Sequence, residues 1–372
     1  MRVYLLIMMV AAAVTFVLVP VAKRLALALG AITQVRARDV HTIPIPRLGG
    51  VAMYAGFVVA FLVASQIPYL AKVFAFGSAA WGVLVGAGLM CLVGAVDDVW
   101  ELDWYAKLAG EILAAGVMAW QGVQLVTVPL MGVTAGSPRL TIFVTIVAVV
   151  LVANAVNFVD GLDGLAAGIA GIAALAFFFY SYTLTRNASP DDYASVACVV
   201  VAALVGICAG FLPHNFHRAR MFMGDSGSML LGLLLACSTI SLTGQIDSSA
   251  LTPSSGDILP ALLPILLPIA VMAIPLADLT LAYIRRTWNG NWWFVADKKH
   301  LHHRLLQRGH SQVKAVLIMY MWTALVAFGV IVLGLVWNGW LVAALVVLVI
   351  LAVLVTVGPL SARHRRAGRD AR

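Results

Sequence analysis

The sequence predicts an all-α polytopic membrane protein with about eleven transmembrane helices, and composition and the recurrence of apolar windows both indicate this class. Hydrophobic residues make up 62% of the 372 residues and charged residues 11%, with a mean hydropathy of +1.00. Apolar windows of about twenty residues, the length that crosses a bilayer, recur along the chain. We therefore expect a single transmembrane domain over residues 1–372, with the lipid bilayer and not nucleic acid as its surroundings.

The candidate spans lie near 3–22, 48–68, 79–96, 105–124, 140–157, 162–184, 193–212, 226–242, 258–285, 314–336 and 338–358. No small-residue cleavage signal follows the first apolar run, which favours a span over a removable signal peptide. The window 258–285 is too long for one straight crossing and carries Pro260, Pro264, Pro268 and Pro275. Because proline removes a helical hydrogen bond, we expect this ninth helix to be bent or broken.

The basic residues orient these spans. If the N-terminus is outside, all but Arg2, Lys72, Arg139 and Arg186 of the 24 lysines and arginines fall on the inner side. Positive charge concentrates on the cytoplasmic side of membrane proteins, so we expect a cytoplasmic C-terminus and cytoplasmic chemistry. All eight histidines fall on the same side. The basic tail 359–372 is expected to be a topology signal and an anchor to anionic lipid.

The stretch 154–165 carries Asn154, Asn157, Asp160 and Asp163, each three residues from the next. On one continuous helix Asp163 would lie roughly opposite Asn154. We therefore expect the helix to end near Asn157, Gly161 and Gly164 to open a tight loop, and the four oxygen-bearing side chains to converge on one small volume. Such a site suits a hard cation and a polyphosphate. The plainer alternative is a set of helix caps and a polar turn.

Other polar clusters fall on the same predicted face. The loop before the second span, Arg36 to Gly50, is either a phosphate-binding loop or a basic loop that serves topology alone. The adjacent Asp97 and Asp98 suit a cation or phosphate between them, with solvated surface charge as the alternative. Lys107 either pairs with Glu111 on its own helix or faces Asp97 and a phosphate.

Two further clusters follow in the second half of the chain. Asp225, in Phe222-Met-Gly-Asp225-Ser-Gly-Ser, stands at an N-cap position, where free backbone N–H groups bind anions. The run from His300 to Arg304 suits a pyrophosphate better than a bare metal ion, because lysines and arginines flank it. The four cysteines lie in apolar segments without metal-binding or redox spacing, and indicate neither zinc nor disulfides.

Five motifs in this order, RDVHTIPIPRLGG, VDDVWELDWYAKLAGE, NAVNFVDGLDGLAAG, FMGDSGS and HLHHRLLQRGHS, resemble those of the polyprenyl-phosphate N-acetylhexosamine-1-phosphate transferases, the glycosyltransferase 4 or MraY-WecA-TagO superfamily. The resemblance covers about Arg36 to Ser311. The sequence His-Leu-His-His-Arg, in place of three consecutive histidines, favours the WecA-like branch over the phospho-MurNAc-pentapeptide transferases of peptidoglycan synthesis. A transporter of an anionic solute is a further alternative, although transporter sites lie near the bilayer midplane.

The resemblance implies a transmembrane transferase of the bacterial cytoplasmic membrane. It would move a sugar-1-phosphate from a UDP-N-acetylhexosamine to polyprenyl phosphate, releasing UMP and forming a polyprenyl-diphospho-sugar. The WecA-like branch implies that the group transferred is GlcNAc-1-phosphate. This is the first membrane step of cell-envelope glycan synthesis. Direct attack by the acceptor phosphate is expected, without a covalent aspartyl intermediate. The sequence leaves open which hexosamine is transferred, whether the carrier is undecaprenyl or decaprenyl phosphate, and which glycan is made. It also leaves open the oligomeric state, for which a homodimer is one possibility.

The resemblance also implies roles for individual residues. It implies Mg²⁺, with Mn²⁺ as a substitute, on Asn157 and Asp225. Phe222 would stack on uracil, with Asp163 near the edge of that base and Asp160 towards the ribose. The implied phosphate contacts are His300, His302, His303 and Arg304, with positive charge from Arg47 and Lys107. Asp97 and Asp98 would handle the acceptor phosphate.

Overall fold

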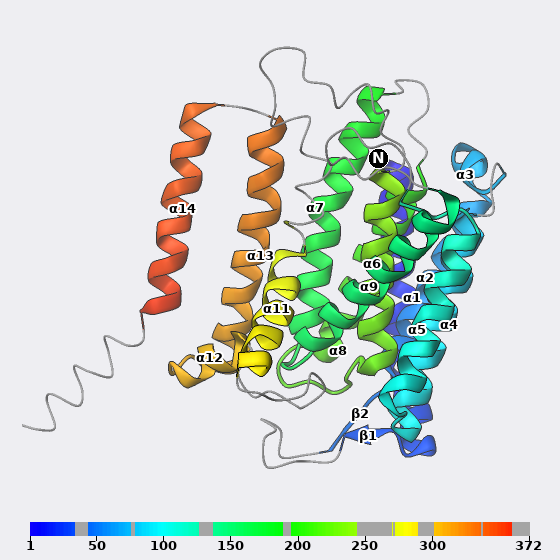
Figure 1. Ribbon diagram of the computed structural model, residues 1–372, viewed down its shortest axis with the longest axis horizontal. Helices are drawn as coiled ribbons and strands as arrows, with labels where there is room; N and C mark the ends of the chain where they lie inside the picture. The colour runs from blue at the N-terminus through cyan, green and yellow to red at the C-terminus, as the bar shows by residue number, and fades with distance from the viewer. Residues whose placement is uncertain are drawn as a thin grey trace, which may run out of the picture.

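The computed structural model (Figure 1) describes residues 1–33, 44–75, 79–125, 137–188, 195–243, 270, 272–288, 301–335 and 338–358. Its helices are α1 (Arg2–Leu29), α2 (Gly49–Ser65), η1 (Pro68–Leu70), α3 (Ala71–Ala75), α4 (Ala79–Trp100), α5 (Trp104–Trp120), α6 (Pro138–Val159), α7 (Leu165–Ala188), α8 (Val196–Asn215), α9 (Gly224–Thr243), α11 (Ala273–Trp288), α12 (Leu301–Gln307), α13 (Gln312–Leu335) and α14 (Gly339–Val357). Strands β1 (Ile32–Thr33) and β2 (Ile45–Pro46) form a short antiparallel pair in which Ile32 faces Pro46.

The described helices make this an all-α polytopic membrane protein, as the composition predicts. Eight of them are long and apolar enough to cross a membrane, and a ninth candidate is α2 together with η1 and α3, which bend away from it by 93°. Helix α5 has 17 residues, or about 26 Å at 1.5 Å per residue, slightly less than a hydrocarbon core of about 30 Å. Residues 258–269 lie outside the described residues, so the bend of the ninth predicted span stays a prediction.

Helix α9 is the centre of the bundle. In its apolar window 83% of the residues are buried, against 6% in α14, which lies at the edge of the molecule beside α13 (Figure 1). Helix α9 packs against α2, α4, α6, α7 and α8. The start of α9, at Gly224, is therefore a point to which several helices can each bring a side chain.

Glycines allow α2 and α4 to approach this point closely. A Cβ atom on Gly50 would lie 2.1 Å from the backbone nitrogen of Gly227, and one on Gly94 would lie 2.4 Å from that of Ser226. Such distances are far below van der Waals contact, so any side chain at Gly50 or Gly94 would push α2 or α4 away from α9. The two glycines therefore let the start of α2 and the end of α4, with Asp97 and Asp98, lie against the first turn of α9.

The loop between α6 and α7 forms as expected, although α6 ends later than the sequence predicts. Helix α6 continues to Val159, two residues past Asn157, and Asp160 is its C-cap. Gly164 has a φ of +75°, a conformation that favours glycine, and α7 begins at the next residue.

Candidate active site

Asp225, in the first turn of α9, lies at the centre of a polar cluster drawn from four helices. Its Oδ1 accepts a hydrogen bond from Asn157 Nδ2 of α6 at 3.0 Å, and its Oδ2 pairs with the Lys107 ammonium of α5. Lys107 also pairs with Asp97 Oδ2 of α4 at 3.1 Å. Asn157 Nδ2 donates a second bond to Ser228 Oγ at 2.9 Å. The structure thus brings four of the predicted site residues into one contact network.

Asp98 lies beside this cluster and holds the start of α9. Its Oδ1 accepts from the backbone N–H of Asp225 at 2.9 Å, and its Oδ2 from that of Ser226 at 3.1 Å. The first N–H groups of a helix lack partners within the helix, and negative charge near them is stabilised by the helix dipole. The anion at this helix start is therefore Asp98 of α4, not Asp225, whose own carboxylate faces Lys107 and Asn157.

These contacts also explain how the negative charges of two adjacent carboxylates, Asp97 and Asp98, are compensated at the end of α4. Negative charge is unfavourable near the C-terminus of a helix, where the dipole is negative. Asp97 is compensated by Lys107 and accepts the backbone N–H of Leu102 at 2.8 Å. Asp98, only 4% exposed, is compensated by the start of α9. The pair does not share one partner, because consecutive helical residues point about 100° apart.

The expected convergence of Asn154, Asn157, Asp160 and Asp163 on one volume is wrong. Asn154 Nδ2 donates to Glu111 Oε2 of α5 at 2.5 Å, deeper in the bundle than Asn157. Both amides lie within α6 three residues apart, so their side chains are about 4.5 Å apart along the helix axis and turned by about 60° from one another. Glu111 therefore has a partner on the next helix, and Lys107 pairs with Asp97 as one of its two predicted alternatives.

Asp163 is buried in a contact between two loops. Its Oδ2 accepts from the backbone N–H of Ala219 at 3.1 Å and lies 3.5 Å from His217 Nδ1. Nearby, the backbone N–H of Gly164 donates to Asn215 Oδ1 at 3.0 Å, and Asn215 Nδ2 donates to the carbonyl of Met221 at 2.9 Å. Asn215 thus ties the α6–α7 loop to the segment before Asp225. Sequence reasoning missed this residue, although a lone amide between a span and the FMGDSGS motif is a usable signal.

Asp160 is half-buried at the end of α6. Its pKa is raised to about 8, first by burial and then by repulsion from Asp225, Asp98 and Asp163. Burial is the larger cause, and the three neighbouring carboxyl groups add to it. A cationic ligand would relieve the repulsion from those groups.

Arg47 and Phe222 lie side by side through backbone pairing. They form a parallel bridge in which Phe222 N–H donates to Pro46 O at 2.9 Å and Gly49 N–H donates to Phe222 O at 3.0 Å. Arg47 Nη2 is 3.8 Å from Glu101 Oε1, and Arg47 Nε is buried without a hydrogen-bond partner among the described residues. The pairing places an arginine with an unused donor next to the segment that leads into Asp225.

The His-rich run is only partly described. His300 lies outside the described residues, and for His302 and His303 the backbone of α12 is described but not the side chains. Arg304 is exposed, and Leu305 packs in an apolar cluster with Val159 and Leu162. Helix α12 therefore lies beside the α6–α7 loop that carries Asp160. The phosphate contacts predicted for this run stay predictions.

The polar cluster lies within a segment that matches a known protein family. Residues 80–243, from α4 to α9, match the profile of glycosyl transferase family 4. Over 364 residues the chain is 42% identical to the decaprenyl-phosphate N-acetylglucosaminephosphotransferase of Mycolicibacterium smegmatis, covering 96% of this chain and 89% of that protein. The Mycobacterium tuberculosis protein of the same name is 42% identical over 332 residues, 87% of this chain and 81% of its own. The chain belongs to glycosyl transferase family 4.

The comparisons also settle the branch of this family 4 protein. A phospho-N-acetylmuramoyl-pentapeptide-transferase of Chlamydia trachomatis is 42% identical over 59 residues only, 16% of this chain and 17% of that protein. The long matches are to N-acetylglucosaminephosphotransferases. The WecA-like branch predicted from the motifs is confirmed.

The residues around Asp225 fit a magnesium ion that phosphate groups help to coordinate. In the described parts of the chain, no group of three or more His, Cys, Asp or Glu residues is arranged to hold a metal ion by itself. Mg²⁺ commonly binds through one or two carboxylates together with substrate phosphates and water. Asp225 offers a carboxylate, and half a turn of the Asn157 side-chain amide would present its oxygen beside it. Asp225 and Asn157 are thus the residues that would hold the ion.

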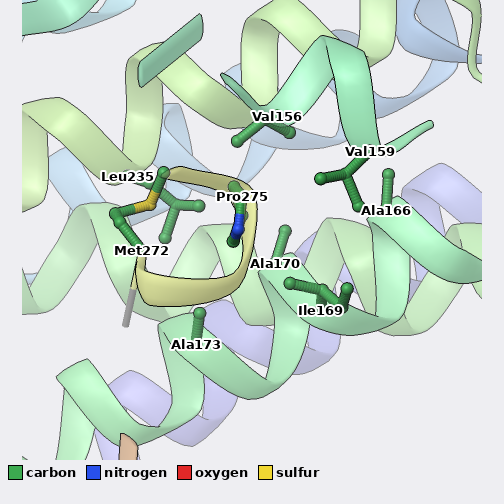
Figure 2. A pocket seen from close by; sticks show the side chains of 9 residues that line it. All are labelled: Val156, Val159, Ala166, Ile169, Ala170, Ala173, Leu235, Met272 and Pro275. Atoms are coloured by element: carbon green, nitrogen blue, oxygen red, sulfur yellow. The ribbon is translucent and has the colours of Figure 1, made fainter. Parts of the chain in front are cut away.

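An apolar hollow lies next to the end of α6 in this transferase (Figure 2). It is lined from α6, α7, α9 and the segment around α11 by Val156, Val159, Ala166, Ile169, Ala170, Ala173, Leu235, Met272 and Pro275. Val156 and Val159 flank Asn157 in the sequence, so the hollow and the polar cluster adjoin along α6.

Proposed function

We propose that this family 4 transferase moves GlcNAc-1-phosphate from UDP-GlcNAc to polyprenyl phosphate, releases UMP, and so begins the assembly of a cell-envelope glycan. The observation that carries this proposal is the meeting of Asp97, Lys107, Asn157 and Asp225, from four helices, within the segment that matches the family. The names of the relatives that match over most of the chain support GlcNAc and a polyprenyl phosphate.

In the proposed reaction an oxygen of the acceptor phosphate attacks the β-phosphorus of the UDP-sugar. A new P–O bond forms, the bond from that phosphorus to the bridging oxygen breaks, and UMP leaves. Phosphoryl transfer needs positioning and neutralisation of charge more than covalent help. Lys107 and Arg47 would supply positive charge, and Asp97 would orient the Lys107 ammonium. When bound at Asp225 and Asn157, Mg²⁺ would supply further neutralisation.

The direct test is a substrate panel. Purified protein is incubated with Mg²⁺, with undecaprenyl or decaprenyl phosphate, and with UDP-GlcNAc, UDP-GalNAc or UDP-MurNAc-pentapeptide, and both UMP and lipid product are measured. We expect both products with UDP-GlcNAc. Product formation only with the pentapeptide substrate would assign the chain to the other branch, and no product with any donor would contradict transferase activity.

Direct attack predicts no exchange in the absence of acceptor. Delipidated protein is incubated with labelled UMP, Mg²⁺ and UDP-GlcNAc, and label in UDP-GlcNAc is followed. A covalent phospho-sugar intermediate would allow sustained exchange, whereas direct attack forbids it. Exchange that disappears in Asp97→Asn would overturn this scheme and make Asp97 the nucleophile.

We further propose that the site faces the cytoplasm of a bacterial cell and that the N-terminus is outside. The bundle end with β1, β2 and α12 lies opposite the N-terminus (Figure 1). Arg47 directly follows β2, and its contact with Glu101 and that of Lys107 with Asp97 place both at the end of α4. The charge bias along the sequence supports an inner location for this end.

This topology predicts which engineered cysteines react in intact cells. Gly339→Cys at the start of α14 has open space around it and should react with a membrane-impermeant thiol reagent, while Gln307→Cys at the end of α12 should react only after permeabilisation. The four native cysteines are buried and should give little background. The reverse pattern would place the Asp225 cluster outside.

A further inference from the structure

Glu111 is a buried carboxyl group in α5 that the proposed reaction does not use. Its side chain is 1% exposed, and its Oε2 accepts the 2.5 Å hydrogen bond from Asn154 Nδ2 of α6. Asn154 Nδ2 also donates to the carbonyl of Val150 at 2.9 Å. Ionisable side chains within membrane-spanning segments are costly and usually mark functional positions.

The pair lies about one helical turn from the Asp225 cluster on both helices. Helix α5 leads away from the cluster and α6 leads into it, so the two helices are antiparallel. Glu111 follows Lys107 by four residues, and Asn154 precedes Asn157 by three, steps that keep side chains on neighbouring parts of one helix surface. In the polar cluster, Lys107 of α5 and Asn157 of α6 both contact Asp225 of α9. About one turn away, α5 and α6 contact each other directly through Glu111 and Asn154.

We propose that Glu111 is a positioning residue for the transferase. Through Asn154 it fixes the rotation of α6 about its axis and so keeps the Asn157 side chain turned toward Asp225. This inference rests on the proposed function, in which Asn157 and Asp225 hold the metal ion.

The composition of α6 explains why such a device is needed. Around Asn157 the helix carries mostly apolar residues, among them Ala155, Val156 and Val159. Apolar contacts of this kind are non-directional and tolerate a rotated helix. A rotation by one position would bring Val156 toward Asp225 in place of Asn157. A buried polar pair specifies one arrangement, as a single buried asparagine does in coiled coils.

The test compares Glu111→Gln, which keeps an oxygen that can accept from Asn154, with Glu111→Leu, which does not. For Glu111→Leu and Asn154→Leu we expect kcat/KM for UDP-GlcNAc to fall by about 10- to 100-fold, the usual cost of losing a residue that orients a metal ligand. Glu111→Gln should stay within about threefold of the unaltered protein, and the double Leu variant should be no worse than either single one, because coupled residues are not additive.

A second measurement does not depend on turnover. Mn²⁺ binding to the full chain in detergent, followed by its electron paramagnetic resonance signal, should weaken in Glu111→Leu by about the same factor and stay unchanged in Glu111→Gln. The matched control is Thr145→Val on the same helix. Thr145 is buried and accepts from Leu125 N–H at 2.9 Å, far along α6 from the cluster, so it should lower the melting temperature without altering Mn²⁺ affinity.

The outcomes separate the positioning role from its alternatives. Unchanged Mn²⁺ affinity and unchanged kcat/KM in Glu111→Leu would overturn the positioning role. A loss in Glu111→Gln as large as in Glu111→Leu would also overturn it, because the charge itself would then act. If Glu111→Leu does not fold, Asn154→Ala removes the other half of the pair and answers the same question. Absence of transfer by the unaltered protein would contradict the proposed function, while the Mn²⁺ measurement would still test the contact.

Discussion

Replacing Asp225 with asparagine is expected to lower kcat by roughly a thousandfold while the protein stays folded. Among the described residues, this carboxylate is the one that contacts both Lys107 and Asn157. Asparagine keeps the shape of the side chain and loses the charge that a hard cation requires. A loss of about 4 kcal/mol of transition-state stabilisation, the scale of metal-assisted charge neutralisation, corresponds to that factor.

The fold should survive this change because the helix start is held elsewhere. The backbone N–H of Asp225, not its side chain, bonds to Asp98, and that bond remains in the variant. The measurement is UMP release over a Mg²⁺ titration, with size-exclusion and thermal unfolding as checks on folding. Asp103→Asn is the matched control, since Asp103 is an exposed carboxylate on the same surface, bonded to Tyr105 OH at 2.7 Å. Near-normal turnover of the Asp225 variant at any Mg²⁺ concentration would remove Asp225 from the site.

The sequence was sufficient to predict the membrane class and most of the residues that meet. Hydropathy locates the spans because lipid forces each helix to satisfy its own backbone and to present apolar side chains. Each predicted window other than 258–285 coincides for most of its length with one described helix, and the second part of 258–285 coincides with α11. The order of polar motifs on one predicted face then placed Asp97, Lys107, Asn157 and Asp225 at one end of the bundle, where the structure joins them.

Partners within that end could not be predicted, because they depend on rotation and on contacts between distant segments. Asp97 and Asp98 are chemically identical neighbours, yet one pairs with Lys107 and the other holds the start of α9. Asn154 and Asn157 look equivalent in the motif, but α6 carries one to Glu111 and the other to Asp225. Which neighbour each amide meets depends on how α6 is rotated against α5 and α9, and the local sequence does not define that rotation.

The second large effect is expected at Gly224, the first residue of α9. Its φ is +67°, and a Cβ there would lie 2.2 Å from Asp98 Oδ2. Alanine at Gly224 would thus meet two penalties: a left-handed backbone, about 1 to 3 kcal/mol for a residue other than glycine, and displacement of Asp98. Moving Asp98 breaks its hydrogen bonds to the backbone of Asp225 and Ser226 and shifts Asp225 itself.

Gly30 makes it possible to separate these two penalties. It has nearly the same backbone conformation, with a φ of +72°, but a Cβ there would meet nothing within 4 Å. Gly30→Ala should therefore lower the melting temperature in detergent through backbone strain alone and leave transfer nearly unchanged. Gly224→Ala should lower the melting temperature further and reduce kcat by on the order of 100-fold, the effect of a misplacement of about 1 Å in a catalytic group. Equal effects of the two substitutions on kcat would show that the contact between Gly224 and Asp98 does not position Asp225, because backbone strain alone would then account for both.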